Sequence, residues 1–286
     1  MTALLFALTA LLWGGGAQAT AMQAGVTPAA WSVAMRMTLA GVLFLGYGRL
    51  RGTALSIPRP DRIAVVAQGL LFFALAFVAF YEATARIPSG LAALVLSTSS
   101  LFAAAIARVA LGTPIAPGFV GGALCGIAGI ALIVAPGVAS VSTASLAGFA
   151  WALVSAAASG AGTVLGARNQ QRGLPVLAVL GWGALAGAAA SALWALGTGA
   201  PFVIDPSPRY LASLLYLAVA ASCITFALYF ELVRRLGPGR AAYTLAVVPL
   251  VALVLSALFE HLTLSASLAA GTAAILLGNV LVLRRG

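Results

Sequence analysis

Residues 80–101, FYEATARIPSGLAALVLSTSSL, resemble residues 229–250, YFELVRRLGPGRAAYTLAVVPL, and this pair of stretches decides the fold. From position 80 to position 229 the offset is 149 residues, and the alignment needs no gap. Both stretches carry the identical residue at these pairs of positions: Glu82 and Glu231, Arg86 and Arg235, Gly90 and Gly239, Ala92 and Ala241, Ala93 and Ala242, Leu96 and Leu245, Leu101 and Leu250. A unit of about half the chain is therefore repeated, which predicts two domains, 1–137 and 138–286.

The composition of the chain is that of an integral membrane protein. Hydrophobic residues make up 63% of the 286 residues and charged residues only 7%, with a mean hydropathy of +1.11. A soluble core of this size needs more polar surface to cover it, whereas helices facing lipid need none. The arginines are scattered singly or in pairs between apolar runs, which argues against a nucleic-acid surface.

Apolar runs of about 20 residues, the length that crosses about 30 Å of hydrocarbon, are separated by Gly, Pro and Arg. They predict an all-α membrane protein with ten transmembrane helices. The predicted spans are 2–24, 29–49, 62–84, 90–111, 117–135, 144–166, 175–197, 209–233, 239–259 and 264–283. The first run lacks a basic leader and contains Trp13 and Gln18, so we expect a retained span and not a signal peptide.

The arginines predict the orientation of these spans. Of the fifteen basic residues, twelve fall on one side: Arg49, Arg51, Arg59, Arg62, Arg108, Arg168, Arg172, Arg234, Arg235, Arg240, Arg284 and Arg285. Short loops rich in arginine stay in the cytoplasm. Both termini are therefore expected to be cytoplasmic. Five spans in each repeat make the second copy inverted with respect to the first, an arrangement that secondary transporters use for alternating access.

The ten spans resemble the drug/metabolite transporter superfamily, specifically its EamA-type members. The resemblance rests on the opening LWG at 12–14, AMRM at 34–37, the Ala- and Leu-rich fourth and ninth spans, and FEHLT at 259–263 before a Gly-bearing last span. The overall pattern is similar to YddG-type exporters of aromatic amino acids. The resemblance implies a transporter of the bacterial inner membrane with its cavity between spans 1, 3, 4, 6, 8 and 9. Two positions depart from symmetry, since Ser100 matches Pro249 and Leu111 matches Glu260.

Aromatic residues predict the walls of a substrate cavity. Trp13 and Trp151 lie at similar depths in the first span of each repeat, each followed by small residues, GGG at 14–16 and SAA at 155–157. A large ring beside a small-residue surface leaves a concavity suited to an aromatic solute. The predicted lining residues are Trp13, Phe77, Tyr81, Trp151, Ser155, Tyr229 and Tyr243. The alternative for each is packing in the core.

Polar residues inside predicted spans are candidates by default, because burying them in lipid is unfavourable. The run STSS at 97–100 predicts that Ser97 or Ser100 faces the cavity; the alternative is hydrogen bonding between helices or to the preceding turn. Pro249 interrupts backbone hydrogen bonding in span 9, which makes that span the better hinge candidate.

The remaining charged candidates form possible gates. Glu82 with Arg86, and Glu231 with Arg235, are i,i+4 pairs that are either gate elements or plain surface pairs. Arg36 lies about two turns inside span 2, where it extends outward, pairs with Glu82 or meets a substrate carboxylate. No carboxylate is expected at the midplane, so tight proton coupling is not supported.

Enzymatic chemistry is not expected. His261 is the single histidine, and no residue is placed to activate the serine run. We therefore expect no catalytic residue, no metal site and no cofactor, and as partners a small-molecule solute and the lipid bilayer. Gly118, Gly122 and Gly126 form a ridge of small residues that predicts either close internal packing or the contact of a weak homodimer.

Overall fold

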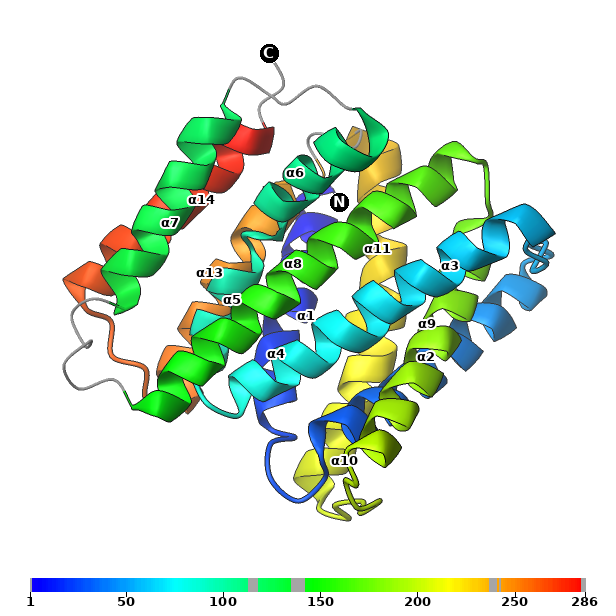
Figure 1. The fold of residues 1–286 in the computed structure, drawn as a ribbon, viewed down its shortest axis with the longest axis horizontal. Helices are drawn as coiled ribbons and strands as arrows, with labels where there is room; N and C mark the ends of the chain where they lie inside the picture. The colour runs from blue at the N-terminus through cyan, green and yellow to red at the C-terminus, as the bar shows by residue number, and fades with distance from the viewer. Residues whose placement is uncertain (1, 113–117, 135–141, 237–240, 242, 284–286) are drawn as a thin grey trace.

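The computed structural model describes residues 2–112, 118–134, 142–236, 241 and 243–283 (Figure 1). Within these residues every regular element is a helix, as predicted for this class of membrane protein. Seven helical segments of the described residues are long and apolar enough to cross a membrane: Thr2–Ala21, Ala29–Leu50, Arg59–Thr84, Ser89–Ala110, Thr143–Gln171, Val176–Gly197 and Pro208–Leu236. Shorter apolar helices are Phe119–Val134, Thr244–Phe259 and Ala266–Val282.

The first half of the chain begins its helices at proline where the sequence predicts it. Pro28 precedes the second helix and Pro88 the first helix after residue 84, each with extended backbone. The elements are α1 (Thr2–Ala21), α2 (Ala29–Leu50), the 3-10 turn η1 (Arg59–Asp61), α3 (Arg62–Gln68), the π-helix η2 (Gly69–Leu75), α4 (Ala76–Thr84), α5 (Ser89–Leu96), α6 (Ser99–Leu111) and α7 (Phe119–Val134).

The second half uses serine caps at two helix starts. The hydroxyl of Ser142 accepts a hydrogen bond from the backbone N–H of Ser145, and Ser207 does the same for Tyr210. The elements are α8 (Thr143–Gln171), α9 (Val176–Gly197), α10 (Pro208–Leu215), the π-helix η4 (Tyr216–Ile224), α11 (Thr225–Leu236), α13 (Tyr243–Phe259) and α14 (Ala266–Leu283).

The predicted span 90–111 is interrupted between α5 and α6. At the interruption the hydroxyl of Ser97 donates to the carbonyl oxygen of Leu94 at 2.7 Å, and that of Thr98 donates to Val95 at 2.7 Å. Such bonds to the preceding turn bend helices. In contrast, α13 continues through the buried Pro249. The sequence favoured a break in span 9 at Pro249, but the break in the described residues lies in span 4, in the first half of the chain. A hinge at Pro249 stays a prediction.

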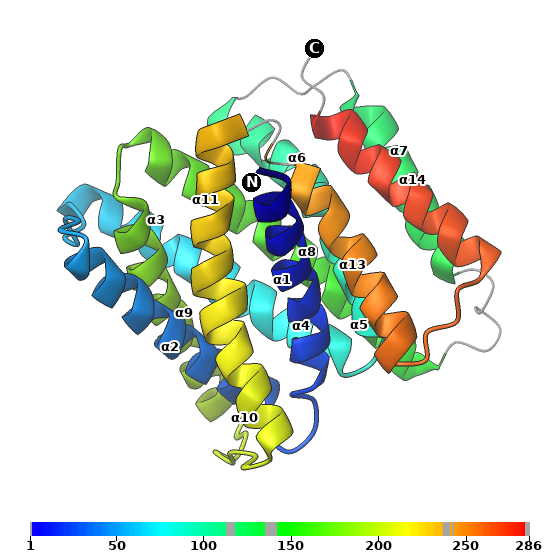
Figure 2. The same ribbon diagram turned by 180° about the vertical axis from the view of Figure 1, so that it is seen from behind.

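Helices from the two halves are packed against one another (Figures 1 and 2). The contact map pairs α2 with α9, α7 with α14, and α1 with α13. The α7–α14 pair, coloured green and red, lies at one end of the molecule. Contacts between distant parts of the chain therefore hold the two halves together.

The ridge formed by Gly118, Gly122 and Gly126 lies largely against α14. A Cβ atom added to Gly122 would lie 2.7 Å from the carbonyl oxygen of Gly278, and one added to Gly118 would lie 2.4 Å from that of Leu281. Gly126 instead approaches Leu101 of α6. Backbones this close need glycine, so the structure uses the ridge for internal packing.

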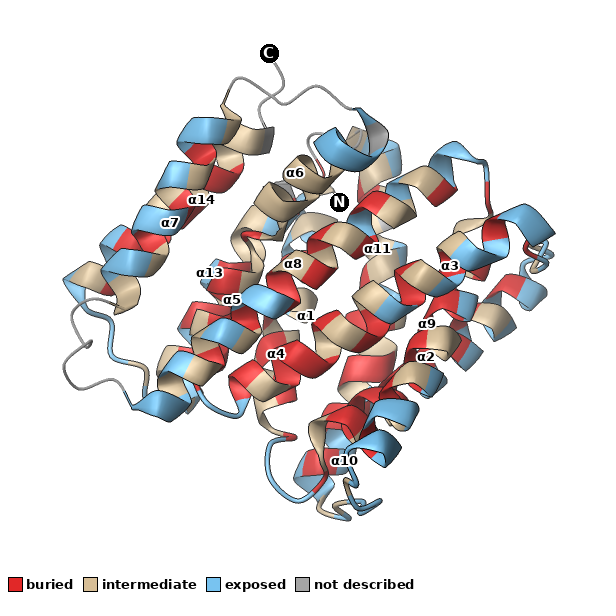
Figure 3. Cartoon of the chain, in the orientation of Figure 1, coloured by how far each residue is buried: buried red, intermediate tan, exposed pale blue. Residues whose placement is uncertain are grey.

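Burial follows the packing, as Figure 3 shows. The largest described core cluster includes Met37 and Phe44 of α2, Phe73 of η2, and Leu217 of η4. Large apolar side chains remain exposed on outward faces, among them Ile127 of α7 at 67%. Apolar surface of this extent suits lipid and not water.

Candidate functional site

Arg36 of α2, the arginine predicted to lie about two turns inside span 2, is 5% exposed. Its guanidinium carbon lies 4.3 Å from the ring centroid of Phe77, over the ring face, and its Nε has no hydrogen-bond partner. Glu82 is paired with Arg86 at 2.5 Å. Of the alternatives left by the sequence, outward extension and pairing with Glu82 are therefore not those adopted.

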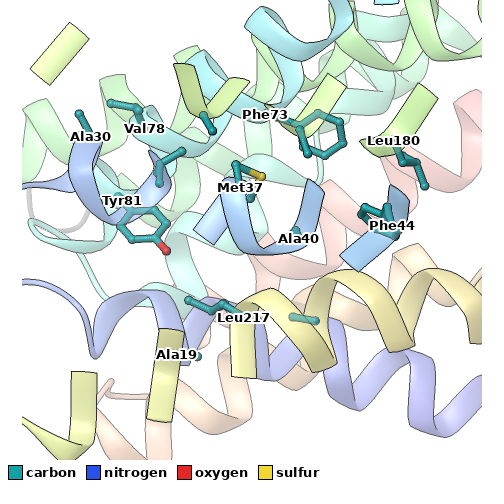
Figure 4. Packing of buried hydrophobic residues seen from close by; sticks show 14 of the residues in the cluster. Ala19, Ala30, Met37, Ala40, Phe44, Phe73, Val78, Tyr81, Leu180 and Leu217 are labelled. Atoms are coloured by element: carbon teal, nitrogen blue, oxygen red, sulfur yellow. The ribbon is translucent and has the colours of Figure 1, made fainter. Parts of the chain in front are cut away.

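Tyr81 of α4 lies beside Arg36 and is 4% exposed. Its hydroxyl donates a hydrogen bond of 2.9 Å to Oε1 of Gln23, in the segment after α1. Gln23 is 2% exposed, and its Nε2 has no hydrogen-bond partner. Tyr81 belongs to the same core cluster as Met37 of α2 and Ala19 of α1, and Figure 4 shows its ring within this cluster. Three segments thus bring their polar groups to one buried place, which we call the Arg36 cluster (Gln23, Arg36, Tyr81).

A cavity of about 350 Å³ adjoins the Arg36 cluster. Its lining includes Thr20 and Gln23 at the end of α1, and Tyr81, Glu82 and Arg86 on or after α4. The predicted gate pair Glu82 and Arg86 therefore lies at the same cavity as Tyr81.

Trp13 of α1 packs against aromatic residues of α11. Its ring centroid is 5.6 Å from that of Phe226 and 5.1 Å from that of Tyr229, and its Nε1 donates to the carbonyl oxygen of Ala221 at 3.1 Å. Trp151 of α8 instead packs against the cluster that contains Phe80. The two tryptophans thus belong to different packing groups, and their placement on opposite cavity walls stays a prediction.

The serine run of span 4 meets α14. The Oγ of Ser100 donates to Oδ1 of Asn279 at 2.9 Å, and Nδ2 of Asn279 donates to Oγ of Ser97 at 3.1 Å. These bonds match the alternative of hydrogen bonding between helices. Asn279 has a clear signal in the sequence, because it is a buried amide inside an apolar run, but it was not among the predicted residues.

Other predicted residues have structural partners. Ser155 of α8 donates to the carbonyl oxygen of Ala76 at 2.7 Å, directly after η2. Glu231 is paired with Arg234 and Arg235, both at 2.6 Å. Tyr243 begins α13, but its side chain lies outside the described residues. Each predicted role for these residues stays open.

The two π-helices, η2 at 69–75 and η4 at 216–224, occupy matching places in the repeat. Adding the offset of 149 to 69–75 gives 218–224, within η4. A π-helical turn widens the helix and occurs frequently at functional sites. Neither π-helix was predictable from the sequence, because no residue type marks such a turn. Tyr81 of the Arg36 cluster lies on α4, the helix that continues from η2.

Comparisons with known proteins agree with this fold. No curated protein matches the chain. A solved structure titled "Crystal structure of protein" matches at a TM-score of 0.67 and 24% sequence identity, covering 98% of this chain and 96% of that one. The model of the EamA-like transporter family matches residues 1–135 and again residues 146–284. The chain therefore belongs to the EamA-like transporter family, in the drug/metabolite transporter superfamily, and is a multi-pass membrane protein of a family of small-solute transporters.

Proposed function

We propose that the chain exports small amphipathic solutes across the bacterial inner membrane by alternating access, with aromatic amino acids as the leading class. The observation that carries this proposal is the exchange symmetry of the helix contacts. By the repeat offset, α1 corresponds to α8, α5 and α6 together correspond to α13, and α4 corresponds to α11. The contact of α1 with α13 therefore matches the contact of α8 with α5 and α6, and the contact of α4 with α8 matches that of α11 with α1. Inverted repeats with such exchangeable contacts supply two conformations of similar energy.

The same symmetry supports ten crossings arranged as two inverted units, 1–137 and 138–286. The two matches of the family model divide the chain in the same way. In both ribbon views α1 begins and α14 ends toward the same edge of the molecule (Figures 1 and 2). Together with the arginine count, this supports cytoplasmic termini. A reporter that is active only in the periplasm, fused after Gly286, should stay silent.

Two groups of aromatic residues support the proposed substrate class. Rings of Trp13, Phe226 and Tyr229 form one aromatic surface, and Phe77 forms another beside Arg36. Aromatic faces favour flat apolar solutes, while a few polar groups orient them. An aromatic amino acid combines both properties.

Transport by the purified protein tests the proposal. The full chain is reconstituted into liposomes preloaded with L-phenylalanine, L-tryptophan, L-alanine, a nucleoside, a polyamine or a cationic drug. We expect radiolabelled aromatic amino acids to exchange faster than in liposomes without the protein, and faster than L-alanine does in liposomes with it. Export is then tested in cells, where expression should lower the accumulation of labelled phenylalanine.

Two outcomes would count against this function. Exchange of another solute from the panel, with none for aromatic amino acids, replaces the substrate class but keeps the transport mechanism. Rates equal to empty vesicles for all solutes favour the competing hypothesis, a membrane assembly protein without a solute path.

A further inference from the structure

Arg36 is a buried charge without an anionic partner. Among the described residues, Asp61, Glu82 and Glu231 form ion pairs with other arginines. Asp205 and Glu260 accept hydrogen bonds from serine residues. Burying an ionised side chain is strongly unfavourable unless it is paired or hydrogen-bonded. A position that keeps a guanidinium in this state needs a reason beyond packing.

Phe77 and the neighbouring hydroxyl of Tyr81 together satisfy only part of the guanidinium. A cation–π interaction uses the face of the planar group, whereas its N–H donors point outward in the plane of the group. The Nε donor of Arg36 is buried and has no partner. The ring therefore leaves hydrogen-bonding capacity unused.

A second unused donor lies nearby. Nε2 of Gln23 is buried without a partner, and Oε1 of the same amide accepts the bond from Tyr81, which lies beside Arg36. Two unpaired donors, one of them charged, are complementary to an anion with two acceptor oxygens. A carboxylate has that geometry and pairs with a guanidinium through parallel hydrogen bonds.

We propose that the Arg36 cluster binds the carboxylate of the transported solute, with the ring of Phe77 beside its apolar part. This inference rests on the proposed function and names the group by which that solute is recognised. Two of the three cluster residues, Gln23 and Tyr81, line the cavity of about 350 Å³. Glu82 in the same lining does not repel the anion strongly, because Arg86 neutralises it at 2.5 Å.

Binding to the purified full chain in detergent tests the inference without requiring transport. The probes are L-phenylalanine and L-phenylalaninamide, titrated by calorimetry at a pH at which both amines are protonated. They share the ring and the amine and differ in the carboxylate. Wild-type protein should bind L-phenylalanine more tightly by roughly tenfold or more, as expected for hydrogen bonds to a charged group. Arg36→Gln should remove this difference.

Arg51→Gln is the matched control, because the Arg51 guanidinium also lies near an aromatic ring, 5.9 Å from the centroid of Tyr47, but is exposed. It should keep the preference of the wild type. Should Arg36→Gln fail to fold, Gln23→Leu removes an unpaired donor from the same cluster. That variant should weaken L-phenylalanine binding more than L-phenylalaninamide binding.

Several results would overturn the inference. These are equal affinity of the wild type for both probes, an unchanged preference in Arg36→Gln, or binding of inorganic phosphate with no binding of L-phenylalanine. Transport assays show whether the carboxylate-binding inference or the proposed transport function has failed. Selective carboxylate binding with no transport contradicts the function alone, and transport without carboxylate preference contradicts the inference alone.

Discussion

The carboxylate of Glu260, directly after α13, accepts a hydrogen bond of 2.7 Å from the backbone N–H of Ser89, the first residue of α5. The same oxygen accepts a bond of 2.5 Å from the hydroxyl of Ser256. Pro88, the residue before α5, cannot cap the helix itself, because its side chain has no atom that accepts a hydrogen bond. An acid from the second half therefore caps a helix of the first half. Leu111 stands at the matching place of the other repeat, so the symmetric place has no acid.

Removing this cap should destabilise the protein. In Glu260→Ala the N–H of Ser89 loses its acceptor, and a lost helix cap reduces the free energy of unfolding by about 0.5–2 kcal/mol. Glu260→Gln keeps one acceptor oxygen and should lose less. Thermal unfolding in detergent measures both, and equal stability of Glu260→Ala and the wild type would contradict the cap.

The contact between α7 and α14 predicts that two neighbouring glycines respond in opposite ways to alanine. Gly122→Ala places a Cβ 2.7 Å from the carbonyl oxygen of Gly278 and should cost about 1–3 kcal/mol. For Gly121→Ala the nearest atom, on Leu281, is 3.8 Å away, so a small gain of helix stability is expected. Thermal unfolding of the two variants checks this, and similar behaviour would show that the helices separate in the membrane.

Asn279 is expected to hold α6 against α14. Asn279→Leu removes its bonds to Ser97 and Ser100, and hydrogen bonds between membrane helices contribute about 1 kcal/mol. The variant should unfold at a lower temperature, with Ser99→Ala as the position control. Should Ser100→Ala change transport selectivity at unchanged stability, Ser100 serves the cavity instead.

The tryptophans should set the size of the substrate. Trp13→Ala and Trp151→Ala are predicted to alter the rate ratio of aromatic to aliphatic solutes, because stacking contributes about 0.5–1.5 kcal/mol beyond area burial. Trp13→Phe keeps a ring but loses the bond to Ala221, and therefore separates stacking from hydrogen bonding. Proteoliposome exchange and thermal unfolding are measured together. Loss of stability with unchanged selectivity would assign both residues to the core, where such truncation costs about 3–5 kcal/mol.

The sequence alone determined which segments are helical and lie in lipid. A run of apolar residues has one stable form in hydrocarbon, a helix that satisfies its own backbone, so long apolar segments such as 29–49 were predictable. The repeat could be predicted from the sequence because the two stretches carry identical residues at a constant offset. The spacing of Gly118, Gly122 and Gly126 likewise predicted a close helix contact, because only small residues permit one.

Tertiary structure alone decided which partner each polar residue meets. Ser155, a predicted cavity residue, donates to the carbonyl oxygen of Ala76, directly after the π-helix η2. Ser97 and Ser100 meet Asn279, which is 179 positions from Ser100. Arg36 lies over Phe77, and Glu82 pairs with Arg86, four residues further along the chain. A hydrogen bond depends on distances of a few tenths of an ångström between atoms from different helices, and the hydropathy of a single segment contains no information about them.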